Sequence, residues 1–410
     1  MQRAPLQPVS EQPMIHWVED GQARSARWRA ESGVAPHKRV MVVDETMTAD
    51  AAYRLACEGT ALLWRGDFQN ARQMLLAMAR RADQKAQKAR KSTSAPNPSA
   101  AEVFPAAFHM HRLARSQRAR TLGMLLLPMT SDYAIPLRRA PDLQRACVEA
   151  YGAYDPPVDD ARHTDSLVSM RELLGIIGAH EWRKKGVDVP ALNDRVHPHY
   201  GVFAPVRGEY VGLVAKAAES LPRAASDADL MALDIGTGTG VLAAVLAQRG
   251  VAKIIATDMD PRALACAHEN IERLGLAAKI RLVQADHFPD ASEGLAALII
   301  CNPPWIPARP SSPIEGAIYD PDSRMLRGFI TGLAAHLAPG GEGWLILSDI
   351  AEHLGLRSRA QVLAYVDHAG LAVIDRLDAR PVHPRVLDAT DPLHAARAAE
   401  VTSLWRLGVR

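Results

Sequence analysis

The stretch "ALDIGTGTGVL", residues 232–242, decides the fold class of this 410-residue chain. It begins as an apolar run typical of a buried strand, and an apolar helical stretch starts at Val241. Between the two stand Gly236, Gly238 and Gly240, which permit positive φ and let a ligand approach the backbone closely. A strand that enters a glycine-rich turn and then a helix is typical of an α/β fold with a ligand at the turn.

A carboxylate follows the turn at a spacing that is typical of nucleoside-binding sites. Asp258 stands eighteen residues after Gly240, at the end of the next predicted strand, where it can accept hydrogen bonds from ribose hydroxyls. Val241 replaces the third glycine of a dinucleotide fingerprint, and Asp234 before the turn would repel a pyrophosphate but attract an ammonium group. This charge pattern favours S-adenosyl-L-methionine, which carries an amino group, a sulfonium and no phosphate.

The chain around this turn alternates short apolar runs with helical stretches from about residue 230 onward. This alternation indicates βαβ units and a parallel sheet covered on both faces. Helices are predicted at 241–250 and 261–276, and two final strands without a clear helix between them suggest a closing antiparallel pair. The predicted strands are residues 230–236, 252–258, 279–286, 295–302, 340–348, 371–379 and 400–408. We therefore expect a Rossmann-like seven-stranded sheet, mostly parallel with a C-terminal antiparallel hairpin, in a domain of residues 195–410.

The first 190 residues have a different pattern. Residues 49–66 and 67–91 show helical spacing and few β-branched side chains. A chain of 410 residues is long enough for two domains. The prediction for residues 1–190 is a mainly α-helical N-terminal domain, with substrate recognition as its expected role.

Composition narrows the class of protein. Hydrophobic content of 48%, charged content of 23% and a net charge of +2 are typical of a soluble globular protein. The four cysteines lie far apart without CxxC spacing, and the histidines of "RVHPHYG" (195–201) have no second ligand cluster, so we expect no metal. Without a signal-peptide core or a membrane-length apolar run, the expectation is a cytoplasmic protein with no membrane partner.

The segment "NPPW", residues 302–305, interrupts the predicted strand 295–302. Pro303 and Pro304 have no N–H to donate, so the ladder cannot continue through them. Asn302 and Trp305 are therefore expected where strand becomes loop, which is where ligands bind in open α/β sheets.

Four segments in order, "ALDIGTGTG", "ATDMDPRAL", "VQADHF" and "NPPW", resemble class I S-adenosylmethionine-dependent methyltransferases. The resemblance is strongest to the HemK-like, or "small", methyltransferases and covers about residues 198–350. The stretch "YGVFAPVRGEYVGLV" (200–214) is similar to their P-R-x-[DE]-T-x-x-L-V segment, with Val206 inserted before Arg207 and Tyr210 in place of Thr.

The resemblance implies a role for particular residues. Asp234 and the glycines would hold the methionine part of the cofactor, Asp258 the ribose, and Asp286 with His287 the adenine edge; Asp286 could equally be a turn residue. Asp260 is more simply the N-cap of the next helix. The implied cofactor residues are Asp234, Gly236, Thr237, Gly238, Gly240, Asp258, Met259, Asp286, His287 and Asn302. The implied catalytic residues are Asn302, Pro303 and Trp305, and the implied acceptor-binding residues are Pro304, Trp305 and Arg207.

In these families the segment at the NPPW position binds a planar nitrogen of the acceptor, which is a glutamine amide, an adenine N6 or a guanine N2. Hydrogen bonds from that nitrogen to the Asn302 side-chain oxygen and the Pro303 carbonyl would orient it and stabilise the positive charge that grows during methyl transfer. Trp305 offers a flat face for stacking, which also suits a cation. The next segment, "YDPDSRML" (319–326), either lines the acceptor pocket or is a solvated loop.

Residues 80–120 hold ten Lys and Arg residues against only Asp83 and Glu102. Such a basic stretch indicates a polyanion partner such as RNA, whereas a solvated helix face is the plain alternative. The sequence therefore slightly favours an N-methyltransferase acting on a nucleic-acid base, adenine N6 or guanine N2 in RNA. A protein glutamine N5-methyltransferase is the alternative, and an NAD-dependent oxidoreductase is a weaker one.

Overall fold

The computed structural model describes residues 13–92, 100–153, 165–221, 231–310, 313–382 and 391–410, without the side chains of 86–104 and 313–314. The chain forms two compact units. The first comprises Met1–Asn97 and Arg112–His180, and the second comprises Pro98–His111 and Glu181–Arg410. Among the residues that the structure describes, no helix combines the length and the apolar character that crossing a bilayer requires.

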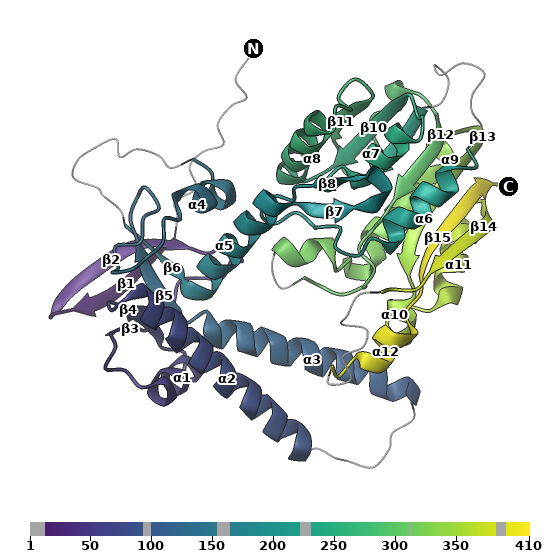
Figure 1. Ribbon diagram of the computed structural model, residues 1–410. Helices are drawn as coiled ribbons and strands as arrows, with labels where there is room; N and C mark the ends of the chain where they lie inside the picture. The colour runs from purple at the N-terminus through teal and green to yellow at the C-terminus, as the bar shows by residue number, and fades with distance from the viewer. Residues whose placement is uncertain (1–12, 93–99, 154–164, 222–230, 311–312, 383–390) are drawn as a thin grey trace. The chain divides into compact units, whose positions relative to one another are not determined.

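The second unit is built on a seven-stranded sheet in the order β11-β10-β9-β12-β13-β15-β14 (Figure 1). The first five strands of that order run parallel, whereas β15 is antiparallel to both of its neighbours, β13 and β14. The predicted mostly parallel sheet with a C-terminal antiparallel hairpin is thus confirmed. Its strands are β9 (Met231–Ile235), β10 (Lys253–Asp258), β11 (Ile280–Gln284), β12 (Ala296–Cys301), β13 (Leu337–Ser348), β14 (Leu371–Ala379) and β15 (Thr402–Val409).

Helices cover both faces of this sheet because its strands bury side chains on both sides. Ile300 packs into a cluster with α6 and α7, while the adjacent Ile299 packs on the other face with α9 and α11. A short helix, α12, lies between the last two strands, where the sequence had indicated no clear helix. The helices are α6 (Glu209–Ala218), α7 (Val241–Gln248), α8 (Pro261–Arg273), α9 (Arg324–His336), α10 (Ile350–His353), α11 (Arg359–His368) and α12 (His394–Ala399).

The strand order reverses between β9 and β12, which lie side by side with β10 on the far side of β9. Open α/β sheets bind ligands at the carboxyl ends of the strands beside such a switch point. Cys301 pairs with Ile235, and Thr257 pairs with Ile235 from the other side. The glycine turn, Asp258 and the NPPW segment therefore leave the sheet at neighbouring positions. Outside the sheet, β7 (Val187–Val189) and β8 (Asp194–Val196) form a separate antiparallel pair.

The first unit contains a six-stranded sheet, in the order β1-β2-β6-β5-β4-β3, that the sequence analysis did not predict. The predicted helices are present beside it, so the expected mainly helical domain is in fact an α/β unit. Its strands are β1 (Met14–Glu19), β2 (Gln22–Arg29), β3 (Val40–Val43), β4 (Ala61–Trp64), β5 (Leu125–Met129) and β6 (Ser166–Ser169). Its helices are α1 (Ala49–Cys57), α2 (Phe68–Ser92), α3 (Ala100–Leu122, whose first part belongs to the second unit), α4 (Gln144–Tyr151) and α5 (Met170–Lys185, which ends in the second unit).

Strand β4 shows why this sheet escaped prediction. The sequence predicted one helix over residues 49–66, but α1 ends at Cys57 and Gly59 adopts a left-handed φ of 83°. The strand that follows, Ala-Leu-Leu-Trp, carries good helix formers and no β-branched residue. It is a strand because all four of its residues are buried between β3 and β5. Tertiary burial overrides local propensity here.

Candidate cofactor and acceptor site

The glycine turn between β9 and α7 is tied to the neighbouring strand β10. The backbone N–H groups of Gly236 and Thr237 both donate to the Thr257 carbonyl, at 2.9 and 2.8 Å. Gly236, Gly238 and Gly240 have φ values of 73°, 55° and 79°, a region that favours glycine. No described heavy atom lies within 4 Å of the position that a Cβ on Gly238 would take. The middle of the turn is therefore open for a ligand to approach its backbone.

Asp234 is 1% exposed and lies on β9 just before the turn. Its Oδ2 accepts hydrogen bonds from the Thr237 hydroxyl, at 2.7 Å, and from the Ala243 N–H, at 3.1 Å. Its Oδ1 is buried without a hydrogen-bond partner in the described part of the chain. Burial raises the pKa of Asp234 to about 6. A buried carboxylate with one unsatisfied oxygen fits the amino group of S-adenosylmethionine, and the Thr237 hydroxyl donates to the other oxygen of that carboxylate.

Asp258 ends β10 and holds the turn from the other side. Its Oδ2 accepts a hydrogen bond from the Gly238 N–H and its Oδ1 accepts one from the Asp260 N–H, both at 3.0 Å. Burial raises the pKa of this carboxyl as well. Asp260 accepts from the Arg262 N–H at 2.8 Å, which confirms it as the N-cap of α8. Met259, a predicted cofactor residue, is 61% exposed at the end of the strand.

Asp286 and His287 follow β11, the next strand along the edge. One carboxylate oxygen of Asp286 pairs with Arg324 and the other lies 2.9 Å from His287 Nδ1. The hydrogen bond from Arg324 holds the pKa of Asp286 below its usual range. His287 has a left-handed φ of 74°, its carbonyl accepts from the Thr257 hydroxyl at 2.6 Å, and its buried Nε2 has no partner among the described residues. Asp286 and His287 are thus held in place by Arg324, Thr257 and each other at this edge of the sheet. Their contact with adenine stays a prediction.

Asn302 is the first residue after β12, beside the glycine turn. The indole N–H of Trp305 donates to the Asn302 side-chain oxygen at 2.9 Å. An amide oxygen has two lone pairs, so one acceptor position remains for another N–H group. The Arg207 guanidinium lies over the Trp305 ring, 5.2 Å from its centre. The Trp305 ring was expected to stack on the acceptor or to contact a cation, and the structure shows the contact with a cation.

Arg207, predicted to bind the acceptor, is held by two carboxylates. Its Nε donates to Glu209 at 2.7 Å, and its Nη1 donates to Glu400 at 3.0 Å. Burial opposes the charge, but Glu400 and Glu209 together raise the pKa of Arg207 above its ordinary value. The sequence analysis missed Glu400, which lies 193 residues away, because no local pattern marks a lone glutamate between a short helix and a strand.

The segment 319–326 is packed against the site. Asp320 is 3% exposed and accepts hydrogen bonds from the backbone N–H groups of Met325 and Leu326, at 2.9 and 3.1 Å, where α9 begins. A Cβ added to Gly236 would collide with the end of the Met325 side chain. The segment was expected either to line the acceptor pocket or to be a solvated loop. The solvated loop is wrong for the buried part of the segment, which reaches the glycine turn.

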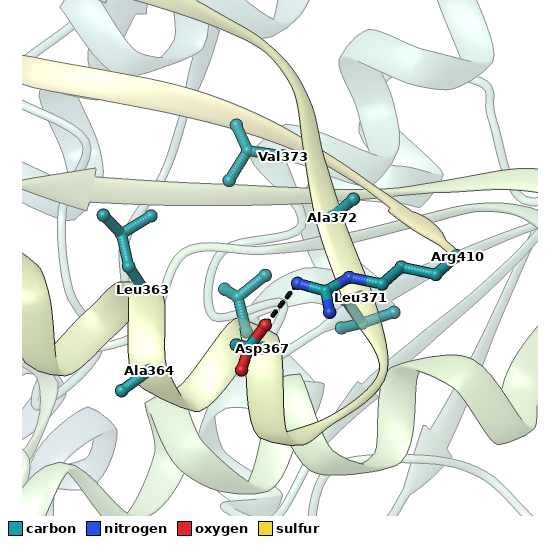
Figure 2. A pocket seen from close by; sticks show the side chains of 8 residues that line it. Leu363, Ala364, Asp367, Leu371, Ala372, Val373 and Arg410 are labelled. Carbon is teal, nitrogen blue, oxygen red and sulfur yellow. Dashed lines mark hydrogen bonds and ion pairs between the residues drawn. The ribbon is translucent and has the colours of Figure 1, made fainter.

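A separate hollow lies between α11 and β14 (Figure 2). Six of its eight lining residues are apolar, and the other two are Asp367 and Arg410, which form an ion pair. It shares no residue with the glycine turn. Within the described residues, no group of three or more His, Cys, Asp or Glu side chains is arranged to hold a metal ion.

Comparison with known proteins identifies the domain around the turn. The family model described as methyltransferase small domain matches residues 214–359. A release factor glutamine methyltransferase from Cereibacter sphaeroides is 37% identical over 163 residues, which cover 36% of this chain and 56% of that protein. A ribosomal protein L11 methyltransferase from Pelotomaculum thermopropionicum is 35% identical over 143 residues, covering 35% of this chain and 38% of that protein. The chain thus spans about half the length, or less, of these two relatives.

Among solved structures, a SAM-dependent methyltransferase from Thiobacillus denitrificans in complex with S-adenosyl-L-homocysteine is 18% identical. The match covers 48% of this chain and 91% of that chain with a TM-score of 0.33, a likeness too remote to carry an argument. Residues 214–359 match the methyltransferase small domain, and this part of the chain is similar to a release factor glutamine methyltransferase and a ribosomal protein L11 methyltransferase.

Proposed function

We propose that this protein transfers a methyl group from S-adenosylmethionine to a planar side-chain nitrogen of a protein, with a glutamine amide as the preferred acceptor. The observation that carries the proposal is the Asn302 oxygen, which follows β12 beside the glycine turn and keeps one lone pair available. The two curated relatives are named for methylation of a release factor glutamine and of ribosomal protein L11, and both acceptors are proteins.

The residues of the site fit the cofactor. The unsatisfied Asp234 Oδ1 would receive the amino group, Asp258 the ribose hydroxyls, and the open Gly238 backbone the close approach of the ligand. When bound, the cofactor supplies an electrophilic methyl group on a sulfonium.

The chain's own contribution is to orient the acceptor. An amide nitrogen is a poor nucleophile because its lone pair is delocalised. Asn302 and the Pro303 carbonyl would each accept one of its N–H groups and would stabilise the positive charge that develops on nitrogen. Holding nitrogen, methyl and sulfur in line is a positioning effect worth up to roughly 7–11 kcal/mol.

The preference for a nucleic-acid base that the sequence suggested finds no support in these relatives. Part of the basic stretch 80–120 is also neutralised in the first unit. Arg81 pairs with Asp50 at 2.6 Å, and Arg118 pairs with Asp83 at 2.7 Å. Other members of the stretch, Lys88, Arg90, Lys91 and Glu102, have side chains that lie outside the described residues. An RNA acceptor is therefore the second candidate, carried by the remaining basic residues alone, and an oxidoreductase has no observation in its favour.

A direct assay separates these acceptors. The purified chain is incubated with methyl-labelled S-adenosylmethionine and, separately, with unmethylated bacterial release factor, unmethylated ribosomal protein L11 and total bacterial RNA. We expect label in release factor that protease removes and ribonuclease does not, with mass spectrometry placing the methyl group on a glutamine. Label confined to the RNA sample would overturn the protein acceptor in favour of the base.

A further inference from the structure

We infer that Glu400 is a positioning residue for the acceptor site and acts through Arg207 and Trp305 on Asn302. The inference rests on the proposed function, because it assigns a purpose to the orientation of the Asn302 amide. It adds a residue that lies outside the matched domain, since the family model covers 214–359 only.

The first contact is the one between Glu400 and Arg207. Glu400 is 4% exposed and lies between α12 and β15. Its two oxygens lie 3.0 and 3.3 Å from Arg207 Nη1, and the Ser348 hydroxyl donates to it at 2.6 Å. Ser348 itself ends β13, so the carboxylate is anchored to the sheet. A side chain held in this way fixes the place of its arginine partner.

The second contact is the one between Arg207 and Trp305. With Glu209 on its Nε and Glu400 on its Nη1, the guanidinium has little freedom to rotate. It lies 5.2 Å from the centre of the Trp305 ring, within the range of a cation–π interaction. The Trp305 carbonyl also accepts a hydrogen bond from the buried Arg357, at 3.1 Å. Trp305 is thus held both through the face of its ring and through its backbone carbonyl.

The third contact is the one between Trp305 and Asn302. The indole N–H donates to the amide oxygen at 2.9 Å, which decides which end of the amide faces the indole. A tryptophan at this position has an N–H donor in its ring, which phenylalanine lacks. Since the oxygen is the group proposed to receive the acceptor, an indole displaced from this place would release the amide to rotate.

A purely stabilising role explains this arrangement poorly. Replacing a buried ion pair by apolar residues of similar volume is often neutral or stabilising, because two charges must lose their hydration. The Arg207–Glu400 pair joins chain segments 193 residues apart and lies next to Trp305 of the NPPW segment.

The test compares the carboxylates of Glu400 and Glu342. Each binds an arginine, but only the arginine bound to Glu400 contacts the predicted site. Glu400→Gln removes the negative charge that holds Arg207, the first of the contacts that lead through Trp305 to Asn302. The matched control is Glu342→Gln, because Glu342 likewise binds an arginine, Arg406 at 2.7 Å, and accepts from an indole, Trp344 at 2.9 Å. Both glutamates lie in the second unit, and neither Arg406 nor Trp344 belongs to the predicted site.

Four measurements are made on each variant. Nitrogen-15 labelling of the seven tryptophans resolves their indole N–H signals, and the Trp305 signal is identified by its loss in Trp305→Phe. Methyl transfer to release factor gives kcat and KM, and calorimetry gives the Kd of S-adenosyl-L-homocysteine. Thermal unfolding shows that each variant is folded, and Arg207→Lys, which keeps the charge but loses the planar fork, serves as the second test variant.

In Glu400→Gln we expect the Trp305 signal to shift, its exchange with water to accelerate and kcat to fall about 10- to 100-fold, with cofactor Kd changed by no more than about twofold. In Glu342→Gln the Trp344 signal should shift while the Trp305 signal and kcat stay unchanged. An unmoved Trp305 signal, or a shifted signal with unchanged kcat, in an active enzyme overturns the positioning role alone. Wild-type protein that methylates none of the three acceptors overturns the proposed function.

Discussion

Cys301 pairs in parallel register with Ile235, so that Asn302 and Gly236, the residues that follow them, leave the sheet side by side. The same Ile235 pairs with Thr257 on its other side, which adds Asp258 to the group. One position of one strand thus brings the NPPW segment, the glycine turn and Asp258 to a single edge of the sheet.

Asp258→Ala should weaken binding of S-adenosyl-L-homocysteine by about 10- to 150-fold, because hydrogen bonds to a charged group contribute roughly 1.5–3 kcal/mol. The substitution removes the proposed partner of the ribose hydroxyls and also the acceptor of the Gly238 N–H. Calorimetric titration measures the change. The matched control is Asp260→Ala, which removes the N-cap of α8 and should cost stability without a comparable loss of affinity. Equal affinity in Asp258→Ala and wild type would remove Asp258 from the cofactor site.

Cofactor affinity should depend on pH through Asp234, whose pKa is raised to about 6 by burial. The ionised carboxylate attracts the ligand's ammonium group, so affinity for S-adenosyl-L-homocysteine should fall as pH decreases through about 6. Asp234→Asn should flatten this profile. Methylthioadenosine, which lacks the amino acid moiety, is the matched ligand and should bind with little pH dependence. The same steep profile for both ligands would contradict the pairing of Asp234 with the amino group.

The stability of the unliganded protein should run in the opposite direction. The folded pKa of Asp234 lies above the usual value of 3.8, so the folded state binds the proton more tightly than the unfolded state. Its contribution is present at low pH and is lost as pH rises from about 4 to about 6. Urea unfolding across this range should show that loss, and Asp234→Asn should lack it. A wild-type profile that rises as steeply as that of the variant would contradict the raised pKa.

Asn302→Ala should reduce kcat for release factor by roughly 100- to 1,000-fold, the cost of removing one group that stabilises a developing charge. Affinity for S-adenosyl-L-homocysteine should stay nearly unchanged, because Asn302 is expected to act mainly on the acceptor. Single-turnover methyl transfer and calorimetry measure the two quantities. Retained activity would show that another group receives the acceptor nitrogen.

Gly238→Ala should destabilise the protein by about 1–2 kcal/mol, the cost of a left-handed conformation for an alanine. It should also weaken cofactor binding, because the new Cβ enters the open side of the turn. Gly275→Ala is the matched control, since Gly275 has a φ of 70° and no described heavy atom within 4 Å of its Cβ position, but follows α8. Both variants should lose similar stability by urea unfolding, and only Gly238→Ala should lose affinity. Equal affinities would show that the ligand does not approach this glycine.

Local pattern alone predicted the seven-stranded sheet of the second unit. The glycine turn, Asp258 and the NPPW segment each depend on neighbours along the chain, and the predicted strand around residue 299 agrees with β12 to within one residue at each end. In the second unit the parallel strands give short apolar runs that alternate with helical stretches, and this alternation is what predicts βαβ units. Asp260 was recognised as a helix cap for the same reason, since a cap is a contact between residues two apart.

Contacts between distant segments decided the rest. The sheet of the first unit was missed because Ala61–Trp64 forms a strand through burial rather than propensity. Glu400 reaches Arg207 across 193 residues, and only the folded chain places that pair against Trp305 and thereby against Asn302. A sequence records which groups can ionise or donate. Which of them meet depends on how the sheet and its helices pack, because side-chain contacts form between surfaces that the chain order does not make adjacent.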